Sequence, residues 1–159
     1  ISEAFRRKQD TLHFIKKAEK DTLAVYKYPE GTLVDLNEAD TTELKKIPGI
    51  GSGIARMIVA YRKRLGGFYD MAQLKEVNYV DEDMLRWFKL GNAPIHRINA
   101  NKAGLDKLRS HPYMNFYQAK VIIEYRRKKG KLKSLSQLSL YEEFTEKDLE
   151  RLSHYLAFD

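Results

Sequence analysis

Apolar residues recur at helical spacing on both sides of a short glycine-rich stretch, residues 48–53. Residues 40–43 before it have the form of a capping box, in which an N-cap acceptor is followed three residues later by Glu. Leu44 and Ile47 then fall on one helical face. After the glycines, a second apolar face comprises Ile54, Ala55, Ile58, Tyr61 and Leu65. This pattern predicts two helices joined by a very short link, with glycines opening the second helix.

The pattern occurs twice. Sliding the sequence by 64 positions, without a gap, places Asn37 on Asn101 and Pro48 on Pro112. The matches continue through Tyr61 and Arg62, which fall on Tyr125 and Arg126, and through Gly66, Gln73, Leu74 and Leu85, which fall on Gly130, Gln137, Leu138 and Leu149. Generic helix pairing would not keep Pro, Gly and Tyr in one register. The sequence therefore indicates an internal duplication.

Each repeat is predicted to contain four short helices. In the first repeat they run roughly over 40–47, 51–65, 70–77 and 81–90, and in the second over 103–110, 115–129, 134–141 and 145–157. Asp70, Asp81, Ser134 and Thr145 are the expected N-caps. We expect an N-terminal polar leader or linker at 1–33, a first domain at 34–93 and a second at 94–159, joined by a linker around Gly91 and Pro94. In the leader, Phe5, Leu12, Ile15 and Leu23 are spaced so that they could line a helix.

Composition narrows the classes of function. The chain has 159 residues, is 43% hydrophobic and carries a net charge of +7 with no cysteine, so it has neither a disulfide framework nor a thiolate metal site. The positive charge favours a polyanionic partner. The charge is uneven: residues 34–93 contain nine basic and nine acidic side chains, whereas residues 94–159 contain thirteen basic and eight acidic ones. No apolar run is long enough to span a membrane, so no membrane contact is expected from this segment.

The glycine-rich link has the chemistry of a phosphate clamp. Backbone N–H groups at a helix start are unpaired and partly positive, and glycine lets a phosphate approach them closely. The predicted phosphate-binding residues are Pro48, Gly49, Ile50, Gly51, Ser52, Gly53 and Arg56. A nucleotide-binding loop would instead need a hydrophobic strand before the glycines, and residues 42–46 do not form one.

These residues carry a family resemblance. Residues 48–51 followed by Ala55, with Asn37 and Ala39 upstream and Gly67 downstream, resemble the helix-hairpin-helix motif of ComEA-type DNA-uptake proteins nearly throughout residues 34–77. The resemblance implies an all-α fold of two tandem helix-hairpin-helix (SAM-like) domains and sequence-independent binding of double-stranded DNA, without a cofactor. It also implies a cell-envelope location with a removed N-terminal anchor. The first residue, Ile1 rather than Met, fits the removal of such a segment. Without an anchor, a cytoplasmic location is expected. By the same resemblance, residues 78–81 and 142–145 occupy second-hairpin positions.

Three of the four hairpins depart from the family pattern. Tyr113 and Asn115 replace the two glycines of the third hairpin, and the Tyr113 ring would occupy the space that a phosphate needs. The second hairpin has Tyr79 and Asp81, and the fourth has a pair of glutamates whose charge would repel phosphate. Two hypotheses remain: weak, non-specific duplex DNA binding through one clamp, or a protein-interaction or structural module on a degenerate scaffold.

Other side chains are weaker candidates. The densest basic run offers accessory phosphate contacts at Arg126, Arg127, Lys128 and Lys131, although cations at a helix C-terminus are also typical of a solvated helix end. Aromatic residues at helical spacing usually fill a core, so we predict core positions for Tyr69, Tyr79, Trp87 and Phe88.

The sequence predicts no enzyme. Some helix-hairpin-helix proteins are DNA glycosylases, and in those that also cut the strand a Lys lies just after the hairpin glycines. The corresponding residue here is Gly53, and Asp70 fits better as an N-cap than as a catalytic acid. The four histidines are scattered, with no i,i+4 pair, so no metal site is expected.

Overall fold

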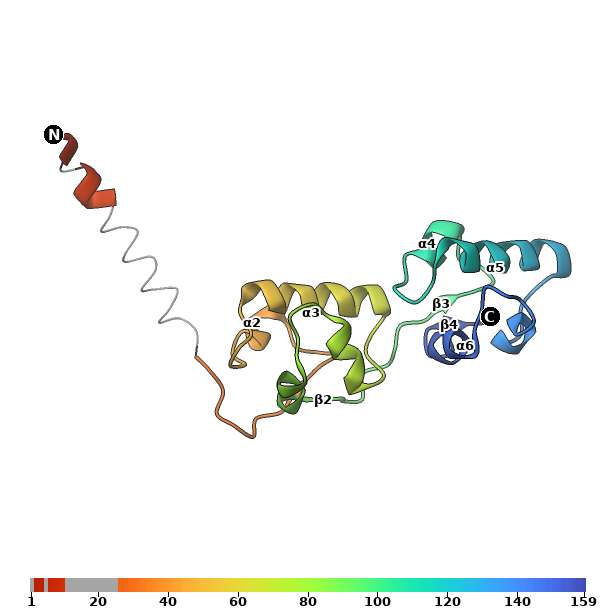
Figure 1. The fold of residues 1–159 in the computed structure, drawn as a ribbon, viewed down its shortest axis with the longest axis horizontal. Coiled ribbons are helices and arrows are strands. Elements are labelled where there is room, and N and C mark those ends of the chain that lie inside the picture. The colour runs from red at the N-terminus through yellow and green to blue at the C-terminus, as the bar shows by residue number, and fades with distance from the viewer. Residues whose placement is uncertain (1, 5, 11–25) are drawn as a thin grey trace.

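Two small helical units lie in line along the long axis of the molecule (Figure 1). The computed structural model of the chain describes residues 2–4, 6–10 and 26–159. Phe5, Leu12, Ile15 and Leu23, which by their spacing could line a helix, lie outside the described residues. We refer to residues 34–93 as the first repeat and to residues 94–159 as the second.

The first repeat is built around one long helix. The helix α3 (Ser52–Leu65) follows the short helix α2 (Thr41–Leu44) across a hairpin turn. Two 3₁₀ helices, η1 (Met71–Glu76) and η2 (Glu82–Trp87), complete the unit. The two-residue strands β1 (Val34–Asp35) and β2 (Phe88–Lys89) pair in parallel, with Val34 opposite Phe88, and join the two ends of the repeat.

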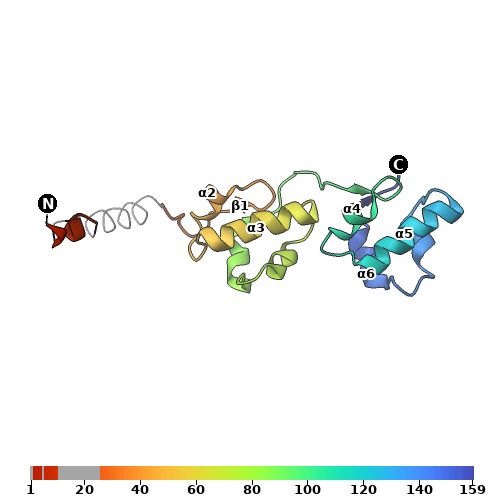
Figure 2. The same ribbon diagram turned by 90° about the horizontal axis from the view of Figure 1, so that it is seen from above.

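The second repeat has the same order of elements. The helix α4 (Leu105–Arg109) leads across a turn to α5 (Phe116–Lys129), followed by η3 (Leu135–Leu138) and α6 (Glu146–Leu152). Strands β3 (Ile98–Asn99) and β4 (Leu156–Ala157) pair in parallel. In both views α3 and α5 run one behind the other, so the repeats are arranged head to tail (Figures 1 and 2).

The predicted fold of tandem helical repeats is confirmed, with differences in detail. The last two helices of the first repeat and the third of the second are 3₁₀ helices, and the strand pairs were not predicted. A two-residue strand shows no alternation of apolar and polar residues, so its sequence carries no periodic signal. The final helices end earlier than predicted, because the residues after them are extended and pair with the start of their repeat.

The duplication extends to individual hydrogen bonds. The Asn37 side chain donates to the carbonyl oxygen of Phe68 at 2.9 Å and accepts from its N–H at 2.8 Å. The Asn101 side chain makes the same two bonds with Leu132, each 2.8 Å long. Each pair ties the start of a repeat to the segment after its long helix, which explains why both asparagines fall in one register.

Each repeat has its own apolar core. Leu44, Ile47, Ile50 and Ile58 of the first repeat are fully buried, as are Leu108 and Ile122 of the second. Of the aromatic residues with predicted core positions, Trp87 and Phe88 are buried and Tyr69 is half-buried. The prediction was wrong for Tyr79, which is 79% exposed because it lies in the turn of the second hairpin.

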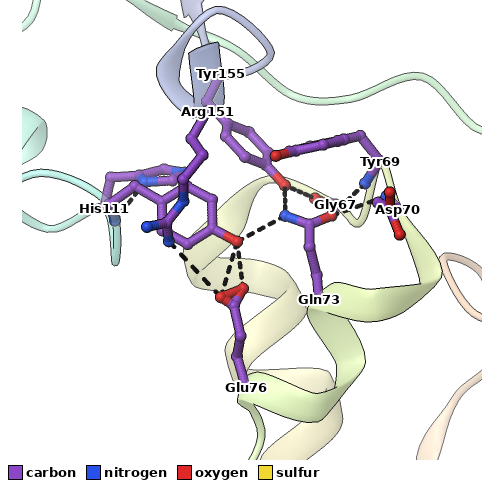
Figure 3. A network of polar contacts seen from close by, with 9 residues as sticks. Gly67, Tyr69, Asp70, Gln73, Glu76, His111, Arg151 and Tyr155 are labelled. Carbon is purple, nitrogen blue, oxygen red and sulfur yellow. Dashed lines mark hydrogen bonds and ion pairs between the residues drawn. The ribbon is translucent and has the colours of Figure 1, made fainter. Parts of the chain in front are cut away.

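A buried polar network joins the two repeats (Figure 3). The Gln73 side-chain amide of the first repeat donates to the hydroxyl oxygens of Tyr113 at 2.9 Å and of Tyr155 at 2.7 Å. Tyr155 in turn donates to the carbonyl oxygen of Gly67 at 2.6 Å. Because these partners are 40 to 88 residues apart in the sequence, the network fixes the orientation of one repeat on the other.

Charged groups complete this network. The Tyr113 hydroxyl donates to both carboxylate oxygens of Glu76, and the Arg151 guanidinium lies 3.7 Å from that carboxylate. The same guanidinium stacks 3.4 Å from the Tyr113 ring centroid, and Tyr69 stacks on His154 with 3.7 Å between centroids. The described residues contain no buried side-chain nitrogen or oxygen without a hydrogen-bond partner. The repeats therefore meet across a fully satisfied polar interface.

His111 lies at the centre of the interface and is held neutral. Its Nδ1 accepts the N–H of Tyr113 at 3.0 Å, so the proton resides on Nε2, which donates to the carbonyl oxygen of Leu65 at 2.8 Å. Burial lowers the pKa of His111 from 6.5 to about 4. Nearby Arg151 and Arg64 lower it further, whereas the bond to Leu65 opposes the shift.

We expect this histidine to make stability depend on pH. Between pH 6.5 and 4 the unfolded chain binds a proton at His111 that the folded protein excludes, so stability falls as the pH decreases through this window. Going from pH 7.5 to pH 5, this group should remove about 2 kcal/mol from the free energy of unfolding, measured by urea denaturation. The His111→Gln variant should lack this part of the dependence. Parallel pH profiles for parent and variant would contradict the assignment.

Candidate nucleic-acid interface

The first hairpin is a tight turn anchored by two buried isoleucines. The N–H of Ile50 donates to the carbonyl oxygen of Ile47 at 3.0 Å, and both side chains are fully buried. Gly49 has φ +89°, a left-handed conformation that side chains disfavour, and Pro48 precedes it as in a type II turn. The turn therefore presents the backbone of Pro48 and Gly49 to solvent.

The start of α3 is open. Gly51 is its N-cap residue, and the helix begins with the bond from the N–H of Ala55 to the carbonyl oxygen of Gly51 at 3.0 Å. Within the part of the chain that the structure describes, the N–H groups of residues 51–54 have no acceptor. A Cβ added at Gly51 or Gly53 would have no heavy atom within 4 Å, and the first turn contains no acidic residue. Four partly positive amides thus face unobstructed space.

The equivalent helix of the second repeat is closed by its own side chains. Asn115, at the position of Gly51, accepts the N–H of Gln118 at 2.8 Å, and the Gln118 side chain accepts the N–H of Asn115 at 2.9 Å. This capping box occupies two of the four initial amides of α5. The amides at the start of the long helix are therefore free in the first repeat, whereas side chains bind two of them in the second.

The third hairpin is buried against the first repeat. His111, Tyr113 and Met114 are at most 9% exposed, and His111 and Tyr113 make the contacts across the interface described above. The Tyr113 ring was predicted to occupy the space of a phosphate. The structure corrects this: the ring is buried at the interface, where the hydroxyl accepts from Gln73 and donates to Glu76. This hairpin serves as a brace between the repeats.

The second and fourth hairpins end in capped helices. Asp81 accepts the N–H of Met84 at 3.1 Å, and its turn residue Tyr79 keeps a left-handed φ of 69°. In the fourth hairpin, Thr145 and Asp148 form a capping box at the start of α6. Carboxylates thus occupy both helix starts, and in the fourth hairpin the carboxylate is that of Asp148.

The predicted clamp residues lie together on one exposed turn, with one exception. Backbone atoms of Gly49, Gly51 and Gly53 are exposed, as are the side chains of Pro48, Ser52 and Arg56. Ile50 is instead a core residue whose N–H is already used within the turn. Arg56 follows Ser52 by four residues and so lies one helical turn behind it.

The predicted accessory cations do not share this surface. The Nη1 of Arg126 donates to the carbonyl oxygens of Ala100 and Ala103, as that of its counterpart Arg62 does to Leu36 and Ala39. Arg126 therefore has a structural role within its own repeat. Arg127, Lys128 and Lys131 are exposed at the far end of α5. Two helices of 14 residues each, in line, place them about 40 Å from the first hairpin.

Lys27 is the residue of this surface that sequence reasoning missed. Its ammonium donates to the carbonyl oxygens of Lys45 at 2.6 Å, Ile50 at 3.3 Å and Ile47 at 3.5 Å. The N–H of Tyr28 donates to the carbonyl oxygen of Lys46 at 2.7 Å. The segment after residue 25, expected to be a leader or linker, thus packs along the first hairpin. Backbone acceptors 18 to 23 residues away leave no pattern in the sequence.

None of the helices described is both long and apolar enough to cross a bilayer. No group of three or more His, Cys, Asp or Glu side chains in that same part of the chain is arranged to hold a metal ion.

We expect the two hairpin glycines to differ in what they contribute to stability. Gly49→Ala should lower the free energy of unfolding by about 1–2 kcal/mol, because the turn requires a left-handed backbone. Gly51→Asn should be neutral or stabilising by a few tenths of a kcal/mol, because φ is −94°, the space is open and Asn is a good N-cap. Urea denaturation of both variants measures the difference. A strongly destabilised Gly51→Asn protein would contradict the description of an open helix start.

A sequence model of the helix-hairpin-helix motif matches residues 30–87 and again residues 94–157. Endonuclease/exonuclease/phosphatase family domain-containing protein 1 from Mus musculus is 27% identical over 154 aligned residues, covering 76% of this chain and 27% of the relative, and the Rattus norvegicus protein matches equally. The Xenopus laevis protein is 25% identical over 146 residues, covering 76% of this chain and 26% of the relative.

The chain spans about a quarter of the length of these curated relatives. No solved structure matches it significantly. The family match supports the helix-hairpin-helix part of the sequence resemblance, but not the ComEA type in particular. Because the two matches to the motif together cover more than half of the chain, the chain belongs to the helix-hairpin-helix family, whose motif indicates nucleic-acid binding.

Proposed function

We propose that this protein binds double-stranded DNA without base preference, through backbone phosphates at the first hairpin. The observation that carries the proposal is the open start of α3, where four amides have no acceptor in the described chain and adjoin exposed glycine backbone. A phosphate is the group that such a site suits, since N–H groups and the helix dipole both favour a negative charge there.

Sequence independence follows from what the hairpin lacks. Reading bases requires side chains that reach the donor and acceptor pattern in a groove, whereas the exposed surface of residues 48–53 consists of Pro, Gly and Ser. Contacts to phosphate position a protein without carrying base information. Binding of single strands generally relies on a row of several stacking aromatics, and the strongly exposed aromatics described in residues 26–93 are two, Tyr26 and Tyr79.

The proposal is for binding without chemistry. Gly53 stands where strand-cutting relatives of the motif would have a Lys, so the chain lacks that nucleophile. The name of the vertebrate relatives includes an endonuclease/exonuclease/phosphatase family domain, and we propose that this chain contributes DNA contact only. Purified protein should therefore leave duplex DNA uncut. A role in competence and DNA uptake is a narrower proposal, which rests on the resemblance of residues 34–77 alone.

A protein-interaction module is the second proposal, and one observation favours it. Phe116 and Tyr117 stand where the first repeat has Ser52 and Gly53, and they are 41% and 68% exposed. Exposed aromatic side chains are typical of surfaces that bind proteins. If the first hairpin has no affinity for DNA, this surface of the second repeat becomes the leading candidate.

A salt titration with duplex DNA tests the proposal. We expect dissociation constants of roughly 10⁻⁴ to 10⁻⁶ M at physiological salt, as for non-specific complexes. If two to five phosphates are neutralised, the logarithm of the binding constant should fall with the logarithm of salt concentration with a slope of about −2 to −4.5. Affinity should be the same for duplexes of different sequence. Fluorescence anisotropy at several salt concentrations measures all three quantities.

Gly51→Asn is the matched variant, because it introduces the N-cap residue of the second repeat without harming the fold. It should lower affinity at least tenfold while its melting temperature stays unchanged or rises. Its Asn side chain would accept the N–H of residue 54 and would occupy the space of the phosphate. Equal affinity of parent and folded Gly51→Asn would show that the hairpin is not the clamp, and a parent that fails to bind at low salt would refute DNA binding.

A further inference from the structure

The carbonyl oxygens of the first hairpin converge on a cation that the chain itself supplies. The Lys27 ammonium donates to Lys45, Ile47 and Ile50, three acceptors that surround the turn from the end of α2 to the residue before the N-cap. We propose that Lys27 is a phosphate-binding residue of the first hairpin, a built-in positive charge provided by the segment that precedes the repeat. This inference rests on the proposed function and adds a residue to its site.

The electrostatics of the hairpin explain why such a charge is needed. The turn places the C-terminal carbonyls of α2, which carry partial negative charge, beside the N-terminal amides of α3, which carry partial positive charge. A phosphate that approaches the amides would therefore also meet the carbonyl oxygens of Lys45 and Ile47. An ammonium bound to those oxygens reverses the sign of the field on that side of the site.

The ammonium is held in place before any ligand arrives. The N–H of Tyr28 binds the carbonyl oxygen of Lys46, and the Lys46 ammonium lies 5.9 Å from the Tyr28 ring centroid. Thr32 closes the following turn by donating its hydroxyl to the carbonyl oxygen of Pro29 at 2.7 Å. Lys27 nevertheless remains exposed to solvent. A cation that is already fixed on three carbonyl oxygens costs little further side-chain entropy when a phosphate binds beside it.

The second repeat provides an internal comparison. The carbonyl oxygens that correspond by the 64-residue register belong to Arg109, His111 and Met114. Across residues 26–159, none of these three receives a side-chain donor. That hairpin is buried between the repeats, and its helix start is capped by Asn115. A lysine is therefore bound at the first hairpin, where the helix start is uncapped, and no equivalent donor is described at the third hairpin, where the helix start is capped.

A neutral donor would satisfy the carbonyls equally well, so a merely structural Lys27 and a phosphate-binding Lys27 differ in salt dependence. Lys27→Met removes the charge and keeps the length of the side chain, and Lys27→Arg keeps the charge. Lys147→Met removes one charge from the exposed first turn of α6 in the second repeat and serves as the matched control. Each full-length variant is titrated with a duplex of about 20 base pairs at several salt concentrations, and its melting temperature is recorded.

We expect Lys27→Met to bind about five- to tenfold more weakly at 0.1 M salt, with a salt slope less steep by about 0.9, which corresponds to one lost phosphate contact. Lys27→Arg should restore the slope, and Lys147→Met should match the parent. If Lys27→Met loses stability, the parent slope regained in Lys27→Arg still identifies the charge as the cause.

The outcomes separate this inference from the proposed function. If the parent binds, Gly51→Asn does not, and Lys27→Met keeps both the affinity and the slope of the parent, the hairpin is the clamp and the role of Lys27 is refuted. The role is also refuted if Lys27→Met and Lys27→Arg lose affinity equally with a slope unchanged from the parent, because a structural effect then accounts for both. A parent without DNA affinity refutes the proposed function and this inference together.

Discussion

Every α-helix starts with backbone amides that have no partner inside the helix. The helices of this chain differ in whether a side chain accepts these amides, and the candidate site depends on that difference. At α5, α6 and η2, side chains of Asn115, Thr145 and Asp81 accept those N–H groups. At α3 the N-cap is Gly51, and no side chain accepts. The amides at the start of α3 therefore remain free within the described chain. We propose that an external acceptor binds there.

The two repeats share one architecture and have diverged in the use of it. In the first repeat the hairpin turn faces solvent, with Gly49 in the left-handed conformation. In the second, Tyr113 replaces that glycine and turns into the interface, where it bonds with Gln73 and Glu76. The same turn is therefore the proposed ligand site in one copy and a brace between copies in the other. Loss of the glycines from the second copy is consistent with this structural use.

Much of the fold could be predicted because its determinants repeat locally. The 64-residue register identified the duplication, and Asn37 and Arg62 prove to make the same bonds as their counterparts in the second repeat. The side-chain oxygens of Gln73 and Gln137 likewise accept equivalent backbone N–H groups. The contacts that escaped prediction are those between distant, non-periodic segments. The Tyr155 hydroxyl donates to the carbonyl oxygen of Gly67, 88 residues away. The Lys27 ammonium donates to backbone carbonyl oxygens, which every residue has whatever its side chain. Such contacts depend on how the folded repeats pack against other segments. The spacing of residues along the chain does not determine that packing.

The central claim is that the amides at the start of α3 receive the phosphate. The most direct measurement is a titration of ¹⁵N-labelled protein with a short duplex, followed by amide chemical shifts in NMR spectra. The account predicts progressive shifts confined to residues 49–54 and their neighbours around Lys27 and Arg56. It predicts little change at residues 113–118 of the second repeat, where the turn is buried and the helix start is capped. Shifts centred on residues 113–118 or on the basic end of α5, with residues 49–54 unaffected, would contradict it.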